Sequence, residues 1–435
     1  MSDPRHAVSD PIEQLKFLRV EEVRDIAERY GTPVFVYDEG SMVAAARSLA
    51  ALSSPYGLTV RYSVKSCPTR AVIRIFDRLG LDFDTSSVWE ALRVVGAGVP
   101  AERILLTAQE AVFDDRLRGL IEAGLRFDAG SLRQLDQYGR AFPGGAVSVR
   151  LNPGFGSGLV NRLTSGGPNS SFGIWHEDLG EVKRLVERHS LRLVRLHSHI
   201  GSGHHWDVLI NAARALLAAA RQFPDVEVID LGGGYRVKSL LGDPEYDHRE
   251  WAEVLGADLR AFAEETGRRL RVELEPGTAI MANSGSLVTR VVDVVSTGAD
   301  GHRFVKTDGG LTEIVRPSYY GAVHPLVSVP ASGPLRDDRE RYCVVGHCCI
   351  AGDLLTPAPG SVEELAPVPL ARTQPGDLLV VERAGGYASS MSMKNFNSFP
   401  EAPEVLRRTD GSVHLIRERQ TLDQIIANER VPAGL

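Results

Sequence analysis

Several side chains capable of acid–base or covalent chemistry follow short apolar runs at the points where those runs end. They are Lys65, Asp84, Arg150, His199 followed by Gly201 and Ser202, Gly232–Gly234, and Glu275-Pro276-Gly277. If the apolar runs are parallel strands closed into a barrel, their carboxyl ends lie on one face, where the catalytic groups of such folds sit. The spacing therefore predicts one site that combines an amine, an imidazole, an anion-binding loop and a carboxylate.

Each of these residue types also has a structural interpretation. A lysine after a strand either forms a Schiff base in a desolvated setting or serves as a rim charge. Three consecutive glycines either let backbone N–H groups approach a phosphate or simply form a turn. A glutamate either keeps the pyridine nitrogen of a cofactor protonated or supports a bend. We favour the functional interpretation because all of them are predicted at the same face.

Two other motifs suggest different chemistry. Gly154-Phe155-Gly156-Ser157-Gly158 follows a strand but lacks the G-x-G-x-x-G spacing of a dinucleotide fingerprint, so we interpret it as a flexible loop. The histidines at 197, 199, 204 and 205 suggest zinc, but no cysteine or carboxylate completes an obvious ligand set. We therefore expect no metal.

The composition indicates a globular enzyme. The chain has 435 residues, 43% of them hydrophobic, a net charge of -7 and a pI near 6.0, and this acidic balance argues against nucleic acid as a partner. No apolar segment resembles a signal peptide or approaches the ~18 residues of a membrane span. The four cysteines form no CxxC pair: Cys67, Cys343, Cys348 and Cys349. We expect a cytoplasmic protein without membrane attachment or a disulfide scaffold.

The elements that would position these groups alternate between strands and helices. Strands are predicted at 60–64, 81–84, 104–107, 126–128, 147–151, 193–200, 226–231 and 271–275. Amphipathic helices are predicted between them, for example at 87–96, 117–124, 206–222 and 251–266. This order predicts the α/β class and a (β/α)8 TIM barrel.

After residue 283 the pattern changes to strands separated by turns rich in Pro, Gly and Ser. Strands are expected at 286–296, 304–307, 342–346 and 377–381, and a surface loop at 328–338. We therefore predict an N-terminal segment at 1–40, a barrel at 41–283 and a mostly β domain at 284–435. The β-run 32–38 is expected to pair with that β domain.

Seven short motifs occur in an order typical of one enzyme family. They are Tyr62-Ser63-Val64-Lys65, His199-Ile200-Gly201-Ser202, Asp230-Leu231-Gly232-Gly233-Gly234, Glu275-Pro276-Gly277, Arg316-Pro317-Ser318-Tyr319-Tyr320, Cys349 with Gly352-Asp353, and Ala384-Gly385-Gly386-Tyr387. From Tyr30 to Arg419 the sequence resembles the fold-type III decarboxylases that depend on pyridoxal 5'-phosphate (PLP). The diaminopimelate decarboxylase branch is the most similar, and ornithine decarboxylase is more distant. The resemblance implies an alanine racemase-like fold, in which a PLP-binding TIM barrel is joined to a β-sandwich or barrel-like domain.

The resemblance also implies a role for each matched residue. Lys65 would carry PLP as a Schiff base, His199 would stack on its ring, and Glu275 would pair with the ring nitrogen. The other implied cofactor-binding residues are Asp84, Arg150, Ser202, Gly232, Gly233, Gly234, Gly277, Thr278 and Tyr387. The implied substrate-binding residues are Arg316, Tyr320, Ile350 and Tyr387. Cys349 would be the catalytic acid, delivered by the partner subunit of a homodimer with shared active sites.

Three positions depart from the family pattern. Thr278 replaces the arginine of E-P-G-R, Ile350 replaces the glutamate of C-E-S-G-D, and Ser171 replaces the lysine of S-K-F-G. The first two changes remove charged partners for the distal zwitterion of meso-diaminopimelate, and a buried charge without a partner costs several kcal/mol. We therefore predict decarboxylation of a less charged or masked amino acid, or of a conjugate such as a carrier-bound one, in secondary metabolism or siderophore assembly.

Two alternative functions stay open at this point. If Arg303 or His347 supplies the missing charge, the chain is a diaminopimelate decarboxylase of lysine biosynthesis. A PLP-dependent racemase is the other alternative. Alanine racemases place an arginine at the pyridine nitrogen, whereas Glu275 would strengthen the electron sink and so favours decarboxylation.

Overall fold

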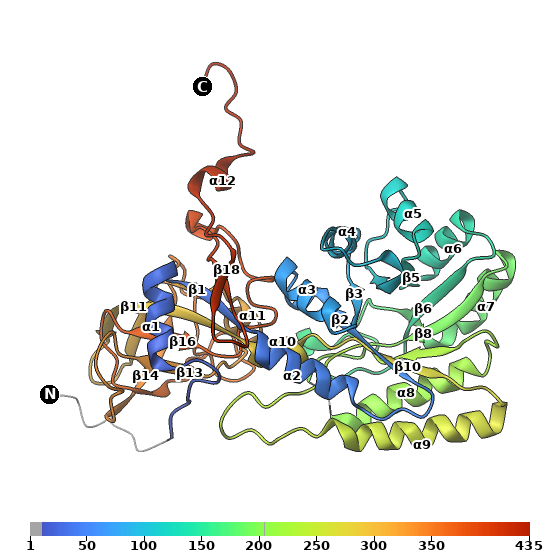
Figure 1. The fold of residues 1–435 in the computed structure, drawn as a ribbon, viewed down its shortest axis with the longest axis horizontal. Helices are drawn as coiled ribbons and strands as arrows, with labels where there is room; N and C mark the ends of the chain where they lie inside the picture. Colours follow the sequence, from blue (N-terminus) through green and yellow to red (C-terminus); the bar gives the residue numbers. More distant parts are fainter. Residues whose placement is uncertain (1–10, 204) are drawn as a thin grey trace. The chain divides into compact units, whose positions relative to one another are not determined.

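The computed structural model describes residues 11–203 and 205–435, which divide into two compact units. The barrel unit comprises residues 43–237 and 245–280, and the β unit comprises the described residues up to 42, 238–244 and 281–435. Each unit is built around its own nine-stranded sheet (Figure 1). The first ten residues of the predicted N-terminal segment, and His204 of the histidine cluster, lie outside the described residues.

Parallel strands close into a barrel in the barrel unit, which confirms the predicted fold class. In order around the ring they are β5 (Arg126–Ala129), β4 (Ile104–Thr107), β3 (Asp82–Thr85), β2 (Leu58–Ser63), β10 (Arg271–Leu274), β9 (Val228–Asp230), β8 (Arg192–His197) and β6 (Ala146–Asn152). Pairing of β5 with β6 closes the ring. The short strand β7 (Ile174–Trp175) adds to β6 outside it.

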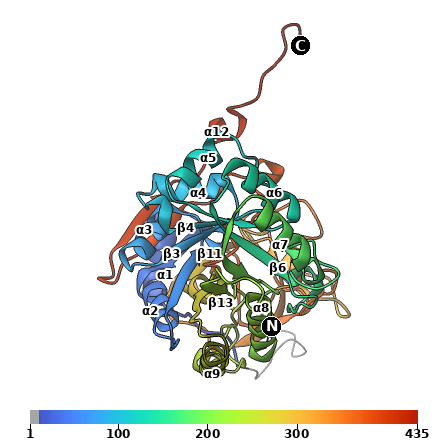
Figure 2. The ribbon, with the colours of Figure 1, turned by 90° about the vertical axis from the view of Figure 1, so that its right-hand side faces the viewer.

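Helices lie around the outside of the barrel strands (Figure 2). They are α2 (Glu39–Ala50), α3 (Arg70–Arg78), α4 (Val88–Gly96), α5 (Asp115–Glu122), α6 (Leu132–Ala141), α7 (Leu179–Arg188), α8 (Trp206–Ala220) and α9 (His248–Thr266). Serine N-caps start two of them: the Ser87 hydroxyl accepts from the Glu90 N–H, and the Ser131 hydroxyl accepts from the Gln134 N–H. Such caps end the βα loops sharply and so fix which residues face the barrel mouth.

Two residues that were predicted to end strands lie just beyond those strands. β2 ends at Ser63, and Lys65 occupies a short 3-10 turn, Val64–Ser66. β8 ends at His197, so the prediction that His199 ends this strand is wrong by two residues. The chain leaves the sheet there because the segment after His197 packs against the loop at 157–165: Ser157 and Ser165 both donate backbone N–H groups to the Ile200 carbonyl, at 3.0 and 3.2 Å.

The β unit contains β1 (Val34–Asp38), β11 (Gly285–Ser296), β12 (Arg303–Thr307), β13 (Leu326–Val329), β14 (Arg339–Val345), β15 (Val368–Ala371), β16 (Leu378–Val381), β17 (Glu404–Arg407) and β18 (Val413–Arg417). Its helices are α1 (Val20–Tyr30), α11 (Arg316–Tyr320) and α12 (Leu422–Ile426), and α10 (Thr278–Met281) connects to it. β1 pairs antiparallel with β11 and parallel with β17, so the N-terminal strand completes this sheet. None of the helices that the structure describes is long and apolar enough to cross a membrane.

The predicted loop at 328–338 is partly wrong. Ser328 and Val329 belong to β13, where they pair with Leu379 and Leu378 of β16. Both residues are buried, and this burial, rather than the local sequence, keeps them in the sheet.

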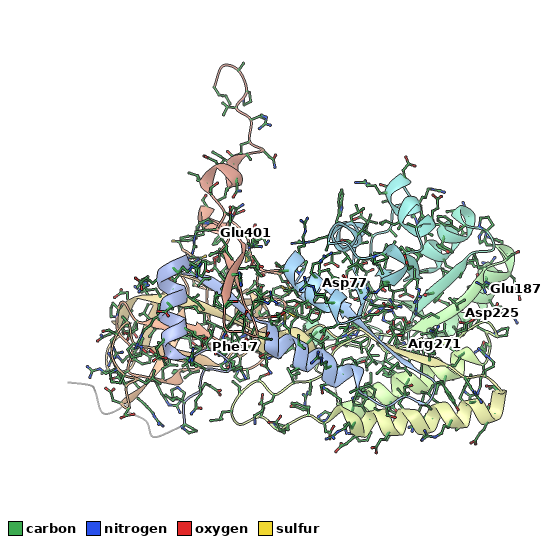
Figure 3. The ribbon with its side chains drawn as sticks, in the orientation of Figure 1. Phe17, Asp77, Glu187, Asp225, Arg271 and Glu401 are labelled. Atoms are coloured by element: carbon green, nitrogen blue, oxygen red, sulfur yellow. The ribbon has the colours of Figure 1, made fainter. Side chains whose placement is uncertain are left out.

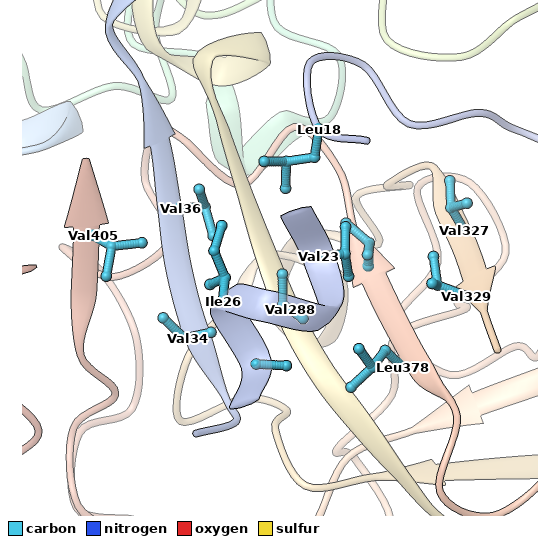
Figure 4. Close-up of a cluster of buried hydrophobic side chains, with 12 residues drawn as sticks. Leu18, Val23, Ile26, Val34, Val36, Val288, Val327, Val329, Leu378 and Val405 are labelled. Atoms are coloured by element: carbon cyan, nitrogen blue, oxygen red, sulfur yellow. The ribbon is translucent and has the colours of Figure 1, made fainter. Parts of the chain in front are cut away.

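The core of the β unit forms where α1 packs on its sheet (Figure 4). Val23, Ile26 and Ala27 project from one face of α1 and are at most 3% exposed. They contact valines and leucines of the strands: Val34, Val36, Val288, Val327, Val329, Leu378, Val380 and Val405. A helix outside the predicted β domain therefore supplies one wall of this core.

Candidate active site

The carboxyl ends of the barrel strands surround a cavity of about 710 Å³. The residues that line it all belong to the barrel unit, and six of them are residues singled out in the sequence: Lys65, Asp84, Arg150, His199, Ser202 and Glu275. They follow or end β2, β3, β6, β8 and β10. The structure therefore brings together the amine, the imidazole and the carboxylates around one cavity.

An ion pair with a buried carboxylate holds the amine. Lys65 Nζ donates to Asp84 Oδ2 at 2.7 Å, and the Ser63 hydroxyl donates to the same oxygen at 2.8 Å. Burial alone would raise the pKa of Asp84, but the Lys65 charge and these two hydrogen bonds outweigh it and lower that pKa. Asp84 therefore stays ionised and holds the lysine amine at one point of the cavity.

A second cluster of charged side chains surrounds His197. Its Nδ1 lies 2.8 Å from Asp128 Oδ2, and its Nε2 lies 3.5 Å from Glu275 Oε2. Burial lowers the pKa of His197, but the Glu275 and Asp128 carboxylates outweigh burial and raise it to about 9. Burial, with the charges of Asp230 and Asp84, raises the pKa of Glu275 well above its usual range. His197 and Glu275 therefore hold at least one proton between them at neutral pH.

Sequence reasoning missed this group. It considered His197 only as a zinc ligand and passed over Asp128 and Asp230. The statement that no carboxylate accompanies the histidines is wrong, because ligand atoms of His197, Asp230 and Glu275 lie within 4.8 Å of one another, all in buried residues. Distant strands bring these residues together: His197 of β8 is in register with Asp230 of β9.

The glycine loop packs against His199. The Gly233 N–H donates to His199 Nδ1 at 3.1 Å, so this ring nitrogen is an acceptor and the imidazole is held against the loop. Gly232 and Gly234 have φ values of 63° and 95°, which favour glycine. A Cβ at Gly233 would lie only 2.4 Å from the Glu275 carbonyl oxygen. Among the described residues, the cavity wall does not include Gly232–Gly234, Gly277 or Thr278.

The donor set of the cavity fits PLP. An aldehyde requires an amine, which Lys65 provides. A pyridine nitrogen requires a carboxyl group, and Glu275 Oε1 is buried without a hydrogen-bond partner in the described part of the chain. A phosphate requires backbone and hydroxyl donors. The Gly234 N–H makes no backbone hydrogen bond within residues 11–203 and 205–435, and Ser202 lines the cavity.

Three predicted residues form a cluster within the β unit. The Arg316 guanidinium lies 5.8 Å from the Tyr320 ring centroid and 6.0 Å from that of Tyr387. Burial lowers the pKa of Arg316, and among the described residues it forms no ion pair with a carboxylate. A half-buried guanidinium without a carboxylate is suited to an anionic ligand.

The two adjacent cysteines have different environments. Cys348 is buried, its N–H donates to Asp353 Oδ2 at 2.8 Å, and burial with the Asp353 charge raises its pKa to about 12. Cys349 is exposed, and its N–H donates to Asn397 Oδ1 at 2.9 Å. The next side chain, Ile350, is 50% exposed. The thiol of Cys349 and the apolar Ile350 are therefore presented at the surface of this unit.

The two residues considered as replacement charges are already engaged. Arg303 forms a 2.8 Å ion pair with Glu340. The His347 ring stacks on Phe399 with centroids 3.7 Å apart, and burial lowers its pKa, so it is neutral at pH 7. Neither residue offers a spare charge to a ligand.

A closed parallel barrel with an amine, an imidazole and a buried carboxyl group at its mouth fits a PLP-binding enzyme. Comparisons with known proteins agree. Residues 41–282 match the family described as "Pyridoxal-dependent decarboxylase, pyridoxal binding domain". The chain therefore belongs to the pyridoxal-dependent decarboxylase family, which confirms the resemblance. It is a PLP-dependent carboxy-lyase.

Individual relatives extend this likeness over nearly the whole chain. A diaminopimelate decarboxylase of Streptomyces coelicolor is 36% identical over 93% of this chain and 91% of its own length. One of Escherichia coli K12 is 33% identical over 95% of this chain and 97% of its own. A crystal structure of a diaminopimelate decarboxylase, 32% identical, superposes with a TM-score of 0.86 over 94% of this chain and 96% of that one.

Proposed function

We propose that this enzyme decarboxylates an amino acid whose distal end carries fewer charges than meso-diaminopimelate, or whose distal charge is masked. Ile350 carries the proposal, because an apolar side chain occupies the position where the family motif has a glutamate. A substrate ammonium group desolvated beside Ile350 would lack its counter-charge, at a cost of several kcal/mol. Thr278, in place of an arginine, removes a second charge.

The cavity wall supports an uncharged or masked substrate. Beyond the charged residues, the wall contains an apolar group: Val88, Trp89, Val112, Leu163 and Phe172. Trp89 is 67% exposed, and the Arg116 guanidinium lies 4.7 Å from its ring centroid. An apolar substituent gains free energy on contact with such a surface, whereas a charged one loses hydration.

The roles of the cavity residues follow from the resemblance and from their contacts. Bound PLP supplies an electron sink for the electron pair that is left when CO2 departs. Lys65 would hold the cofactor covalently, and Asp84, 2.7 Å from the lysine nitrogen, would keep that nitrogen positioned. His199 packs on the ring from one side. Glu275 holds a proton at the ring nitrogen, with His197 beside it as a fixed positive charge.

The remaining roles are proposed on the same basis. The phosphate would be bound by Ser202 and by the Gly232–Gly234 loop, and Arg150, Gly277 and Thr278 would support the cofactor. Arg316 and Tyr320 bind an acidic group of the substrate, which agrees with the absence of a carboxylate partner for Arg316 within the described residues.

Cys349 is the proposed acid that returns a proton to the substrate carbon. Its exposed position is what a residue requires if it serves the site of another copy of the chain, and we propose a homodimer on this basis. Its neighbour Cys348 is unsuited to this role, because it is buried and its pKa is raised to about 12.

The test is turnover of the purified holoenzyme on a panel of amino acids and N-acyl or carrier-linked conjugates. CO2 release and the amine product are measured together, because a racemase would give an inverted amino acid without CO2. We expect CO2 release to be highest with substrates that lack the distal ammonium group. Efficient turnover of meso-diaminopimelate would contradict the proposal and would support the second candidate, a diaminopimelate decarboxylase, which the names of the relatives favour.

A further inference from the structure

A second cavity, of about 400 Å³, lies at the other end of the barrel, where the strands begin. Arginines dominate its charged lining: Arg126, Arg192, Arg195 and Arg271. Three of them are the first residues of β5, β8 and β10. Figure 3 labels Arg271 at this end of the barrel unit. Glu227 is the single acidic residue in the described lining, and no lining residue is shared with the cavity that contains Lys65.

One buried carboxylate behind this cavity contacts three guanidinium groups. Glu273 accepts from Arg61 at 2.7 and 3.0 Å and from Arg195 at 2.8 Å, and Arg126 lies 3.8 Å away. Asp82 lies 3.4 Å from Arg61 and 3.2 Å from Arg103, and Arg103 also pairs with Asp77 at 2.7 Å. The negative charges of the carboxylates at this end of the barrel therefore do not balance the positive charges of its guanidinium groups.

Individual arginines reflect this excess of positive charge. Burial, with the charges of Arg61 and Arg195, lowers the pKa of Arg126. Arg195 is 3% exposed, and its Nε has no hydrogen-bond partner in the described part of the chain. A buried guanidinium N–H without an acceptor is costly, and an anion in the cavity is one way to satisfy it.

The outer arginines are free to turn towards a ligand. Arg192 is exposed, and its side chain forms no ion pair with the residues that the structure describes. Arg271 approaches Glu227 only at 3.9 Å. Asp225 is not part of the described lining and interacts instead with the charge of Arg268.

We propose that this basal cavity binds a small, multiply charged anion that carries a phosphate group. Guanidinium groups bind phosphate oxygens in bidentate fashion, and several of them around one hollow suit a tetrahedral dianion better than a single carboxylate. The volume exceeds that of one phosphate, so a diphosphate or a small phosphate ester also fits. The proposal rests on barrel geometry and is independent of the proposed substrate.

Calorimetric titration of the PLP-loaded enzyme tests the proposal, because the cofactor then fills its own phosphate site. Inorganic phosphate, diphosphate, a sugar phosphate and a dicarboxylate are titrated separately at low ionic strength. We expect saturable binding of the phosphate compounds and at least tenfold weaker binding of the dicarboxylate. Comparing the affinities for inorganic phosphate and for the sugar phosphate shows whether the site prefers free phosphate or a phosphate ester.

Two variants locate the site. Arg192→Gln should weaken phosphate binding at least tenfold and leave CO2 release unchanged, because Arg192 is exposed at the start of β8, whereas the Lys65 cavity lies at the carboxyl ends of the strands. The matched control is Arg214→Gln, which removes an exposed arginine that pairs with Asp258 at 2.8 Å on the barrel surface, and it should bind phosphate as the unmodified enzyme does. Absence of saturable binding, or equal binding by Arg192→Gln and the unmodified enzyme, overturns the proposal.

Discussion

Replacing Asp128 by asparagine tests whether the barrel mouth holds His197 as a cation. Asp128 lies 2.8 Å from His197 Nδ1, and both side chains are at most 1% exposed. The substitution keeps the size of the side chain but removes its charge. Asp128 is therefore a positioning residue, which acts on the site through His197 and Glu275.

The sign and size of the effect follow from the pKa of His197. Its rise from 6.5 to about 9 is worth ~3 kcal/mol of folding free energy. Because the folded pKa lies above the unfolded one, this stabilisation is complete below pH 6.5 and is lost as the pH rises through 9. Loss of a nearby opposite charge lowers a pKa by ~1–3. Asp128→Asn should therefore cost ~1.5–3 kcal/mol at pH 6 and little at pH 10.

Thermal unfolding of the two proteins between pH 6 and pH 10 measures this difference. We expect Asp128→Asn to unfold ~3–8 °C lower at pH 6, with the gap closing as the pH rises through 9. The matched control is Asp136→Asn, which breaks a 2.8 Å contact with His189 at the surface and should change stability by no more than ~1 kcal/mol. A gap that is independent of pH, or that widens at high pH, would refute the argument.

Four further substitutions, in three variants, test the proposed site. Lys65→Ala should abolish both CO2 release and the visible absorption of the bound cofactor, and retained absorption would contradict the role of Lys65. Cys349→Ala should lower kcat by ~10²-fold or more without changing the cofactor spectrum, as expected for loss of a general acid, whereas an unchanged kcat would exclude it. The double variant Ile350→Glu/Thr278→Arg should raise kcat/KM for meso-diaminopimelate at least tenfold. If kcat/KM does not rise, these two positions do not determine the substrate specificity.

The residues that end the barrel strands were predictable because a βα-barrel places successive strand ends on one face. Lys65, Asp84 and Glu275 therefore converge as expected, although His199 lies beyond the strand that was predicted to contain it. The roles assigned to them stay predictions.

The site residues that the sequence did not predict come together only through the register between strands. His197 contacts Asp128 because β5, β6 and β8 are aligned in a particular way, and no local pattern in any one strand specifies that alignment. Strand β13 was assigned in part to a loop for a similar reason, since only its pairing with β16 defines it. The predicted domain boundaries at residues 40 and 283 stay predictions.

We propose that Ile350 and Thr278, in place of two charged family residues, changed the substrate of this enzyme. The most direct measurement compares kcat/KM of the unmodified enzyme for meso-diaminopimelate and for 2-aminopimelate, which lacks only the distal amino group. We predict at least a ~10²-fold preference for 2-aminopimelate, the size expected when a desolvated charge has no partner. Equal values, or a preference for meso-diaminopimelate, would contradict it.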